Sequence, residues 1–175
     1  MSDTTHISLD LRGTLLTPGQ RLERSFEMEV EPICVGGQIY EALVEEGSAR
    51  VKVERVSGGY LVTVDLRAAL YGPCVRCLDE VKVAVDAEQQ EFVPVESEKW
   101  KGTEVSEFVN DLVVDLSGLS REALILALPA KLLCAEDCVG LCPQCGRRQG
   151  HPECSCSKDA VDPRFEKLRH LSIEP

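Results

Sequence analysis

Alternating apolar and polar residues predict strands in the first half of the chain. From Arg50 to Val56 valines alternate with charged residues, and in residues 60–66 every second position is Tyr, Val or Leu. The Ser-Gly-Gly turn at residues 57–59 separates the two runs, so together they predict a β-hairpin. Residues 81–87 alternate in the same way and predict a further strand. A weaker pattern predicts another strand over residues 21–30.

The second half of the chain has a different pattern. Residues 96–107 are polar and predict a loop, while residues 108–114 predict a short strand. Residues 115–128 carry leucines and alanine at helical spacing, with Asp115 or Ser117 available as the N-cap and Pro129 as a stop. The predicted fold class is therefore α+β, an antiparallel β-sheet body with one main helix.

The composition changes at Cys134. From there the chain is rich in Cys, Gly, Pro and Arg and has too few apolar residues for a core of its own. Residues 162–171 begin with Asp-Pro, a favourable helix start, and predict a short terminal helix. We therefore expect an α+β body over residues 1–133, followed by a Cys-rich metal-binding lobe and terminal helix over residues 134–175.

The charge is unusual. The 175 residues include 30 acidic and 19 basic side chains, a net charge of −11. This balance argues against a protein that binds nucleic acid through bulk electrostatics or a membrane through a polybasic segment. From Cys142 onward, however, six basic residues face five acidic ones, against 13 and 25 in the rest of the chain. We expect any RNA contact to be local to this end and a basic protein partner to bind elsewhere.

No signal peptide or membrane span is apparent in the sequence. The first residues lack a basic stretch followed by a long apolar one, and no apolar run approaches the roughly 18 residues that cross a bilayer. These observations predict a cytoplasmic protein without a membrane partner. In that reducing setting, clustered cysteines are more often metal ligands or redox centres than disulfides.

Eight of the nine cysteines lie in closely spaced pairs. Two residues between thiolates allow the backbone to turn so that both sulfurs face one ion, and tetrahedral zinc takes four such ligands at about 2.3 Å. We predict two zinc sites, whose ligands are Cys74, Cys77, Cys134 and Cys138 in one, and Cys142, Cys145, Cys154 and Cys156 in the other. The alternative is a single ion, held by Cys138, Cys142, Cys145 and one of Cys154 or Cys156.

Other interpretations of the cysteines stay open at this point. The pair Cys74 and Cys77 could be a redox dithiol, although a strand pattern follows it where thioredoxin-type motifs begin a helix. Four thiolates could also hold an iron–sulfur cluster. His151 could replace one cysteine as a ligand, but an exposed loop histidine fits its surroundings better. The ninth cysteine, Cys34, lies between Ile33 and Val35 and is expected to be a buried small apolar residue.

Motifs for catalysis are missing from the sequence. It contains no HExxH, no GxSxG elbow, no phosphate-binding GxxxxGK[ST] loop and no GxGxxG fingerprint. Four protein sulfurs on each zinc would leave no open position for water, which is the arrangement of a structural site. The expected protein is therefore not an enzyme, and no catalytic residue is assigned.

The cysteine motifs and their neighbours resemble a known family. The segments that carry the resemblance are Cys74-Val75-Arg76-Cys77-Leu78, the leucine-rich stretch 122–129, the run from Cys138 to Gly146, Cys154-Ser155-Cys156, and Asp162-Pro163-Arg164-Phe165 with Leu168. Their order and spacing are similar to those of the large ribosomal RNA subunit accumulation proteins, the YceD-like family. The resemblance implies a role in ribosome biogenesis, in the production or processing of large-subunit (23S) ribosomal RNA, and no enzyme activity.

Three functions remain in competition. The first is a zinc-stabilised factor that contacts ribosomal RNA or a pre-ribosomal particle. The second is an acidic adaptor that docks a basic ribosomal protein or a ribonuclease, because an acidic surface steers basic partners toward itself. The third is a thiol redox or metal sensor, which would need an exposed cysteine of low pKa. The resemblance favours the first.

Overall fold

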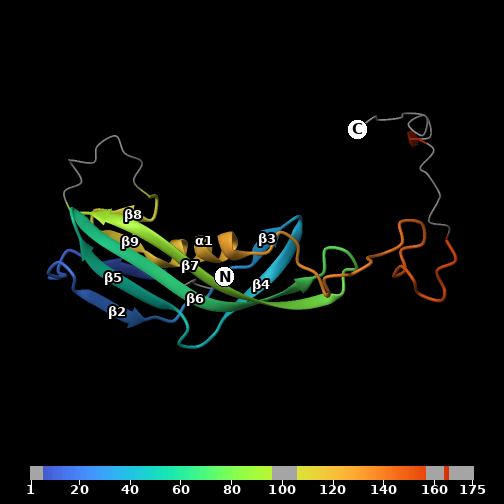
Figure 1. Ribbon diagram of the computed structural model, residues 1–175, viewed down its shortest axis with the longest axis horizontal. Coiled ribbons are helices and arrows are strands. Elements are labelled where there is room, and N and C mark those ends of the chain that lie inside the picture. Colours follow the sequence, from blue (N-terminus) through green and yellow to red (C-terminus); the bar gives the residue numbers. More distant parts are fainter. Residues whose placement is uncertain (1–5, 96–105, 157–163, 166–175) are drawn as a thin grey trace.

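The computed structural model describes residues 6–95, 106–156 and 164–165 (Figure 1). Among these residues the elements are, in chain order, β1 (Ser8–Asp10), β2 (Arg21–Ser25), β3 (Ile33–Val35), β4 (Gln38–Val44), β5 (Arg50–Val56), β6 (Gly59–Pro73), β7 (Glu80–Pro94), β8 (Val109–Asn110), β9 (Val113–Asp115) and α1 (Leu116–Ala127). The fold is α+β, mostly antiparallel sheet with one helix, as the sequence predicts.

Two long strands lie side by side in the main sheet, and among the described elements β7 pairs with β6 alone. β6 and β7 pair antiparallel over their whole length, from Gly59 opposite Pro94 to Pro73 opposite Glu80. The other edge of β6 is shared, because its first half pairs with β5 and its second half with β4. β2 pairs with β5, and β3 pairs with β4. The sheet edge beyond β5 and β4 therefore consists of two separate short strands.

Two tight turns shape this sheet. The predicted hairpin is confirmed as β5 and β6, joined through Gly58 at a φ of 83°. A second hairpin, β3 and β4, turns at Gly36 and Gly37 with φ of 58° and 80°. Positive φ at both turn positions suits the right-handed twist of the strands, and glycine adopts it without strain. The Gly-Gly pair is a hairpin signal that the hydrophobic pattern alone did not bring out.

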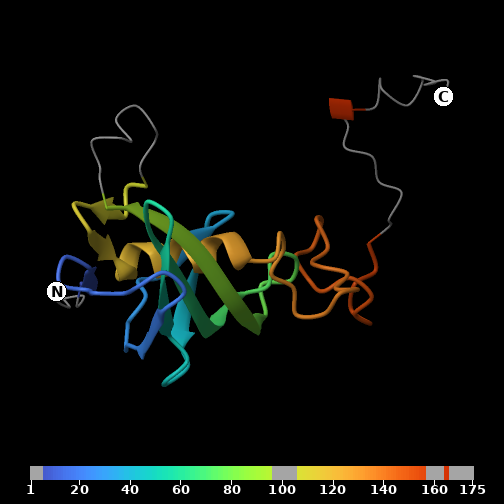
Figure 2. The same ribbon diagram turned by 60° about the vertical axis from the view of Figure 1, so that its left-hand side comes forward.

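The core lies between one face of the sheet and α1. Tyr60, Val62, Val64 and Leu66 of β6 point to this face and are buried. α1 packs across β6 and β7 (Figure 2), and the side chains that it buries most completely are Leu119, Ala123 and Leu124. Each fully buried aliphatic side chain of this kind contributes roughly 1.5–3 kcal/mol. Because aromatic residues are only 5% of the chain, aliphatic packing carries the body.

The helix begins as the sequence predicts. The Asp115 carboxylate accepts a hydrogen bond from the backbone N–H of Gly118 at 3.0 Å, which makes Asp115 the N-cap. A Cβ at position 118 would lie 2.7 Å from that carboxylate and 2.8 Å from the Phe108 ring, so a larger residue would have to displace these side chains. α1 ends at Ala127, two residues before Pro129.

Several boundaries differ from the predictions. The strand predicted over residues 21–30 ends at Ser25, and residues 26–32 leave the sheet before β3 begins. The single strand over residues 108–114 is wrong, because β8 and β9 form a hairpin there and pair onward with β1. Most of the predicted loop 96–107 and most of the terminal helix 162–171 lie outside the described residues. The division into domains at residue 134 stays a prediction.

Candidate metal centres

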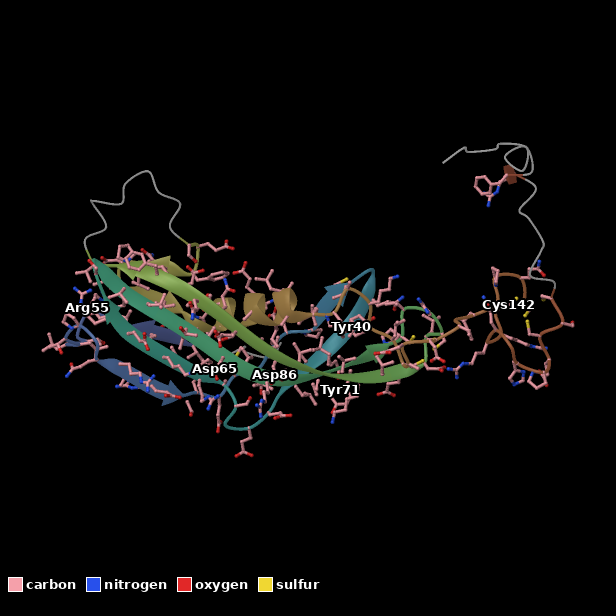
Figure 3. All side chains as sticks on the ribbon, in the orientation of Figure 1. Tyr40, Arg55, Asp65, Tyr71, Asp86 and Cys142 are labelled. Carbon is pink, nitrogen blue, oxygen red and sulfur yellow. The ribbon has the colours of Figure 1, made fainter. Side chains whose placement is uncertain are left out.

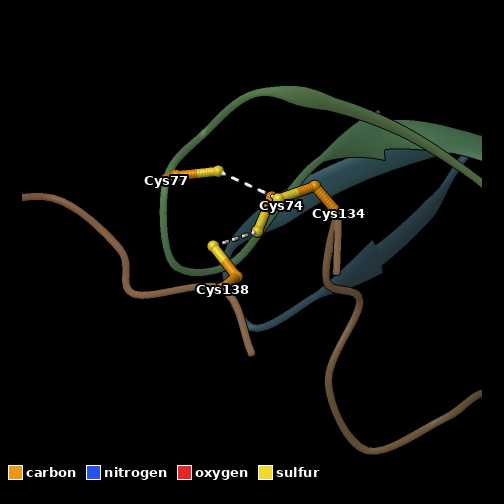
Figure 4. A group of neighbouring side chains, drawn as sticks. All are labelled: Cys74, Cys77, Cys134 and Cys138. Carbon is orange, nitrogen blue, oxygen red and sulfur yellow. Dashed lines mark hydrogen bonds between the residues drawn. The ribbon is translucent and has the colours of Figure 1, made fainter. Parts of the chain in front are cut away.

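The first cysteine group joins the end of the sheet to the segment after α1. Cys74 follows β6 directly, and Cys77 lies in the turn toward β7. Cys134 and Cys138 come from the chain that leaves the helix. All four Sγ atoms lie within 4.8 Å of one another, with Cys74 to Cys138 at 3.8 Å and Cys77 to Cys134 at 3.5 Å (Figure 4).

Backbone hydrogen bonds give this group its shape. The Leu78 N–H donates to the Cys74 carbonyl at 2.9 Å, with Leu78 at a φ of 63°, and closes a tight turn around Cys77. The Arg76 N–H points at the Cys74 sulfur, 3.5 Å away. The Val75 N–H donates to the carbonyl of buried Leu132 at 2.9 Å. Hydrogen bonds alone thus hold the turn against the segment after α1, without a contribution from a metal ion.

The second group lies within the Cys-rich segment itself. The Gly146 N–H donates to the Cys142 carbonyl at 2.8 Å, and Gly146 has a φ of 71° that few other residues adopt. The Sγ atoms of Cys145 and Cys154 are 3.8 Å apart, and Cys142 and Cys156 complete a set within 4.8 Å. Figure 3 shows Cys142 beyond the end of the long strands.

Two arginines and a glycine connect the groups. The Arg76 guanidinium donates to the Cys138 carbonyl at 2.6 Å, and its own carbonyl accepts from the Leu141 N–H at 3.1 Å. Arg148 approaches Cys134 Sγ at 3.8 Å and the Asp79 carboxylate at 3.3 Å. Between them, Gly140 passes the Arg76 carbonyl so closely that a Cβ would lie 3.1 Å from it. The sequence patterns did not single out these three roles.

In each group, the surroundings lower the pKa of one cysteine thiol and raise the pKa of another. Burial raises the pKa of Cys74, but backbone N–H groups of Arg76 and Cys77 outweigh it and lower the pKa to about 6. The N–H groups of Cys145 and Gln144 lower the pKa of Cys142 to about 6 as well. Hydrogen bonding to Cys145 and burial instead raise the pKa of Cys156 to about 12. A nearby cation would favour the thiolate form of all four cysteines in a group.

The sulfur positions fit a tetrahedral ion. Four ligands at about 2.3 Å from a tetrahedral centre lie about 3.8 Å from one another. Three of the Sγ–Sγ distances are 3.5, 3.8 and 3.8 Å, and every pair within a group lies within 4.8 Å. Each group could therefore hold a metal ion. The eight cysteines fall in the two sets favoured by their spacing, and the single-ion alternative is not the arrangement found, because Cys138 belongs to the first group. Metal binding by these residues stays a prediction.

The remaining candidate residues lie outside both groups. His151 accepts a hydrogen bond at Nδ1 from the Glu153 N–H at 3.3 Å and is not among the clustered ligands. The expected burial of Cys34 is wrong, since this residue is exposed on β3. In that strand Ile33 takes the inward position, and alternation sends Cys34 to the opposite face.

Comparison with known proteins places this arrangement in a family. The model of the large ribosomal RNA subunit accumulation protein YceD matches residues 62–172. The chain belongs to the YceD family. The matched part of this YceD-family protein starts in β6 and includes both cysteine groups and α1.

Curated relatives of this YceD-family protein are mycobacterial. Uncharacterized proteins of Mycobacterium tuberculosis and Mycobacterium bovis are each 38% identical over 125 residues, 67% of this chain and 58% of theirs. One from Mycobacterium leprae is 31% identical over 128 residues, 69% of this chain and 57% of its own. The chain thus spans less than two thirds of these relatives. No solved structure matches. None of the helical segments in the described part of the chain combines the length and the apolar composition of a membrane span.

Proposed function

We propose that this YceD-family protein supports the accumulation of large-subunit ribosomal RNA as a non-enzymatic factor, and that two zinc ions stabilise its Cys-rich part. The observation that carries the proposal is the match of the family model across residues 62–172, which includes all eight clustered cysteines. Family membership supports the link to large-subunit RNA, and the thiol geometry supports the metal.

Zinc suits these centres because each offers four sulfur donors and nothing else. Cysteine thiolates are the ligands of closed structural zinc sites, in which no position remains for a reactive water. In the first centre, Cys74 and Cys77 would be tied to Cys134 and Cys138, so that the ion joins the β6–β7 turn to the chain after α1. The second ion would organise a segment that has almost no apolar core, and it would act on folding rather than on chemistry.

Direct contact with RNA would be limited. Arg147 forms an ion pair with Glu153 at 3.4 Å, and Arg148 forms one with Asp79 at 3.3 Å. Each thiolate centre with a divalent ion would also carry a formal charge of about −2. Few phosphate contacts imply a shallow dependence of binding on salt.

The acidic adaptor remains a second candidate function, because the pre-ribosomal particle would then be bound partly through one of its proteins. Glutamates lining the grooves beside β4 favour it specifically.

Depletion of the protein in cells tests the role. We expect the ratio of large-subunit to small-subunit ribosomal RNA to fall, and to be restored by the wild-type gene. A Cys142→Ser, Cys145→Ser double variant should restore it poorly, while Cys34→Ser should restore it fully because that residue lies outside both centres. Unchanged ribosomal RNA after depletion would refute the proposal. Equal rescue by both variants would remove the second centre from the function.

A further inference from the structure

The edge of the main sheet is interrupted between β2 and β3. β2 pairs with β5 and β3 pairs with residues 38–40 of β4, but no strand among the described residues pairs with the outer edge of residues 41–44. Residues 26–32 bridge the interruption. Their start is held by Phe26, whose N–H donates to the Ala49 carbonyl at 3.0 Å, and their end by Arg121, which donates to the Glu31 carbonyl at 2.7 Å.

Three adjoining hollows follow this interruption, and together we call them the edge groove. Two of them, of about 570 and 360 Å³, lie between residues 26–32 and residues 41–47 and share Met28 and Val44. The third, of about 400 Å³, shares Glu41 with the second and continues toward the turn that carries the first cysteine group. The edge groove is thus long enough to receive a segment of chain rather than a single side chain.

The charge of the edge groove has one sign. Among the described residues that line it there is no lysine or arginine, whereas the acidic residues are Glu27, Glu29, Glu41, Glu45, Glu46 and Glu80. Arg50 and Arg67 lie in the neighbouring hollow beside Glu45 and Glu46, but they form ion pairs with Asp65 and Asp86. At the other end of the groove, the Lys82 ammonium lies 5.3 Å from the centre of the Tyr71 ring. Figure 3 shows Tyr71 on the side of the sheet away from α1. The edge groove therefore favours a ligand that brings positive charge.

The edge groove also displays apolar side chains to solvent. Leu43 is 59% exposed and Ile39 is 67% exposed, and both lie on the same outward face of β4. Single exposed apolar residues are common on protein surfaces and need no explanation. Here two of them border a groove that is also lined by Met28 and Val30. A ligand that covered them would gain about 25 cal/mol for each Å² of apolar surface removed from water.

We propose that the edge groove binds an extended basic segment of a partner protein, with apolar side chains between its cationic ones, along the free edge of β4. An unpaired strand edge offers main-chain hydrogen bonds to an added strand, while flanking pockets select alternate side chains. A nucleic acid would bring its phosphates against six glutamates, and a second copy of this chain would bring a net charge of −11. The proposal rests on the adaptor role and specifies its site and partner chemistry.

A synthetic peptide of alternating lysine and valine, fluorescently labelled, tests the proposal against the full metal-loaded chain. We expect it to bind and to protect the amides of residues 41–44 from hydrogen exchange. Leu43→Ser and Glu41→Lys should each raise the Kd about tenfold. The matched changes Leu15→Ser, at a residue 96% exposed outside the groove, and Glu54→Lys, on β5, should leave the Kd unchanged. Thermal unfolding checks that all four variants are folded.

Several outcomes would overturn the proposal. Absence of peptide binding would refute the proposal. An equal loss of affinity in the groove and control variants would show that the peptide is held only by unspecific attraction between charges. Protection of residues 41–44 by oligouridylate instead of the peptide would assign the edge groove to RNA. Protection of the same residues in the free chain, rising with protein concentration, would assign it to a second copy. The ribosomal RNA ratio after depletion is measured separately, so failure of the groove and failure of the proposed function are distinguishable.

Discussion

At the scale of single residues, Gly140 shows how closely the Cys-rich segment lies against the β6–β7 turn. Its φ is 78°, and a Cβ there would stand 3.1 Å from the Arg76 carbonyl. The same carbonyl accepts the hydrogen bond from the Leu141 N–H. Gly140 therefore meets two requirements. Its backbone is left-handed, and it allows two segments of the chain, each next to a cysteine group, to approach closely.

Replacing Gly140 by alanine separates these requirements. We expect Gly140→Ala to lower the free energy of unfolding by about 2 kcal/mol, because the left-handed conformation alone costs roughly 1–2 kcal/mol and the contact with Arg76 adds to it. Gly150→Ala is the control, since Gly150 has a φ of 81° and open space around it. Chemical denaturation measures both. Equal losses in the two variants would show that the close approach has no energetic weight.

The cysteine ligands and the residues around them differ in how far they can be predicted. The spacing of the eight cysteines was enough to propose two sets of four, because a turn of two to four residues determines which sulfurs can meet. Arg76 and Arg148 carry no such signal. Their partners, the Cys138 carbonyl and the Asp79 carboxylate, are distant in the sequence, and only the folded chain brings them near.

At the scale of elements, cross-strand pairs hold β5 against β6. Arg50 lies opposite Asp65, and the Asp65 carboxylate, 14% exposed, meets Arg50 at 2.7 Å and Lys52 at 3.0 Å. Burial alone would raise the pKa of Asp65, but the hydrogen bonds from Lys52 and Arg50 lower it below its ordinary value. A further pair, Arg67 with Asp86, joins β6 to β7 at the surface.

The lowered pKa of Asp65 makes a testable contribution to stability. Asp65→Asn should cost about 1 kcal/mol at neutral pH, whereas Asp86→Asn should cost less than about 0.5 kcal/mol because Asp86 is 81% exposed. The contribution of Asp65 is present above the ordinary carboxyl pKa of about 3.9, since the unfolded chain binds the proton more readily. It is lost as the pH falls through the lowered pKa.

Denaturation of the wild-type chain and both variants between neutral and acid pH measures this contribution. The difference between wild type and Asp65→Asn should shrink toward zero in acid. Any effect of acid on the cysteine centres is common to all three proteins and cancels in the comparison. A difference that stayed constant with pH would mean that the carboxylate charge has no part in it.

Strand lengths show where periodicity stops being informative. β6 continues past Leu66 through Ala68, Ala69 and Leu70, all three of which are buried, so no alternation marks it. β7 continues through the polar run Glu88 to Glu91, beyond the strand predicted over residues 81–87. Each run is a strand because the other long strand supplies its backbone partners: Ala68 to Leu70 lie opposite residues 83–85 of β7, and Glu88 to Glu91 lie opposite residues 62–65 of β6. Pairing between long strands depends on the whole hairpin, which a local window does not contain.

At the scale of the whole molecule, metal is expected to determine whether the Cys-rich part is ordered. Elemental analysis of the native protein should find two zinc ions per chain. Structural zinc contributes on the order of 10 kcal/mol to small domains, and residues 134–156 have few apolar contacts to replace it. Chelation should therefore remove hydrogen-exchange protection from residues 134–156, while the paired centre of β6 and β7 stays protected.

One variant in each cysteine group tests where the two ions bind. Cys74→Ser should reduce the zinc content to one ion and weaken the attachment of the segment after α1. Cys154→Ser should also leave one ion and affect residues 142–156 alone. Iron in place of zinc, a single ion in the wild type, or undiminished protection after chelation would each contradict the two-centre assignment. Cys34→Ser, at an exposed cysteine outside both groups, should retain both ions.

The sequence by itself determined the antiparallel strands around the 57–59 turn, the helix capped by Asp115, and the likeness to the YceD family. These features depend on local periodicity, capping and motif spacing, which neighbouring residues encode. Only the tertiary structure showed the contacts of Arg76, Arg148 and Gly140 that connect the two cysteine groups. It alone also showed the edge groove beside β4. They arise where segments far apart in the chain meet, and for the groove, where residues 26–32 leave an edge of β4 without a partner strand.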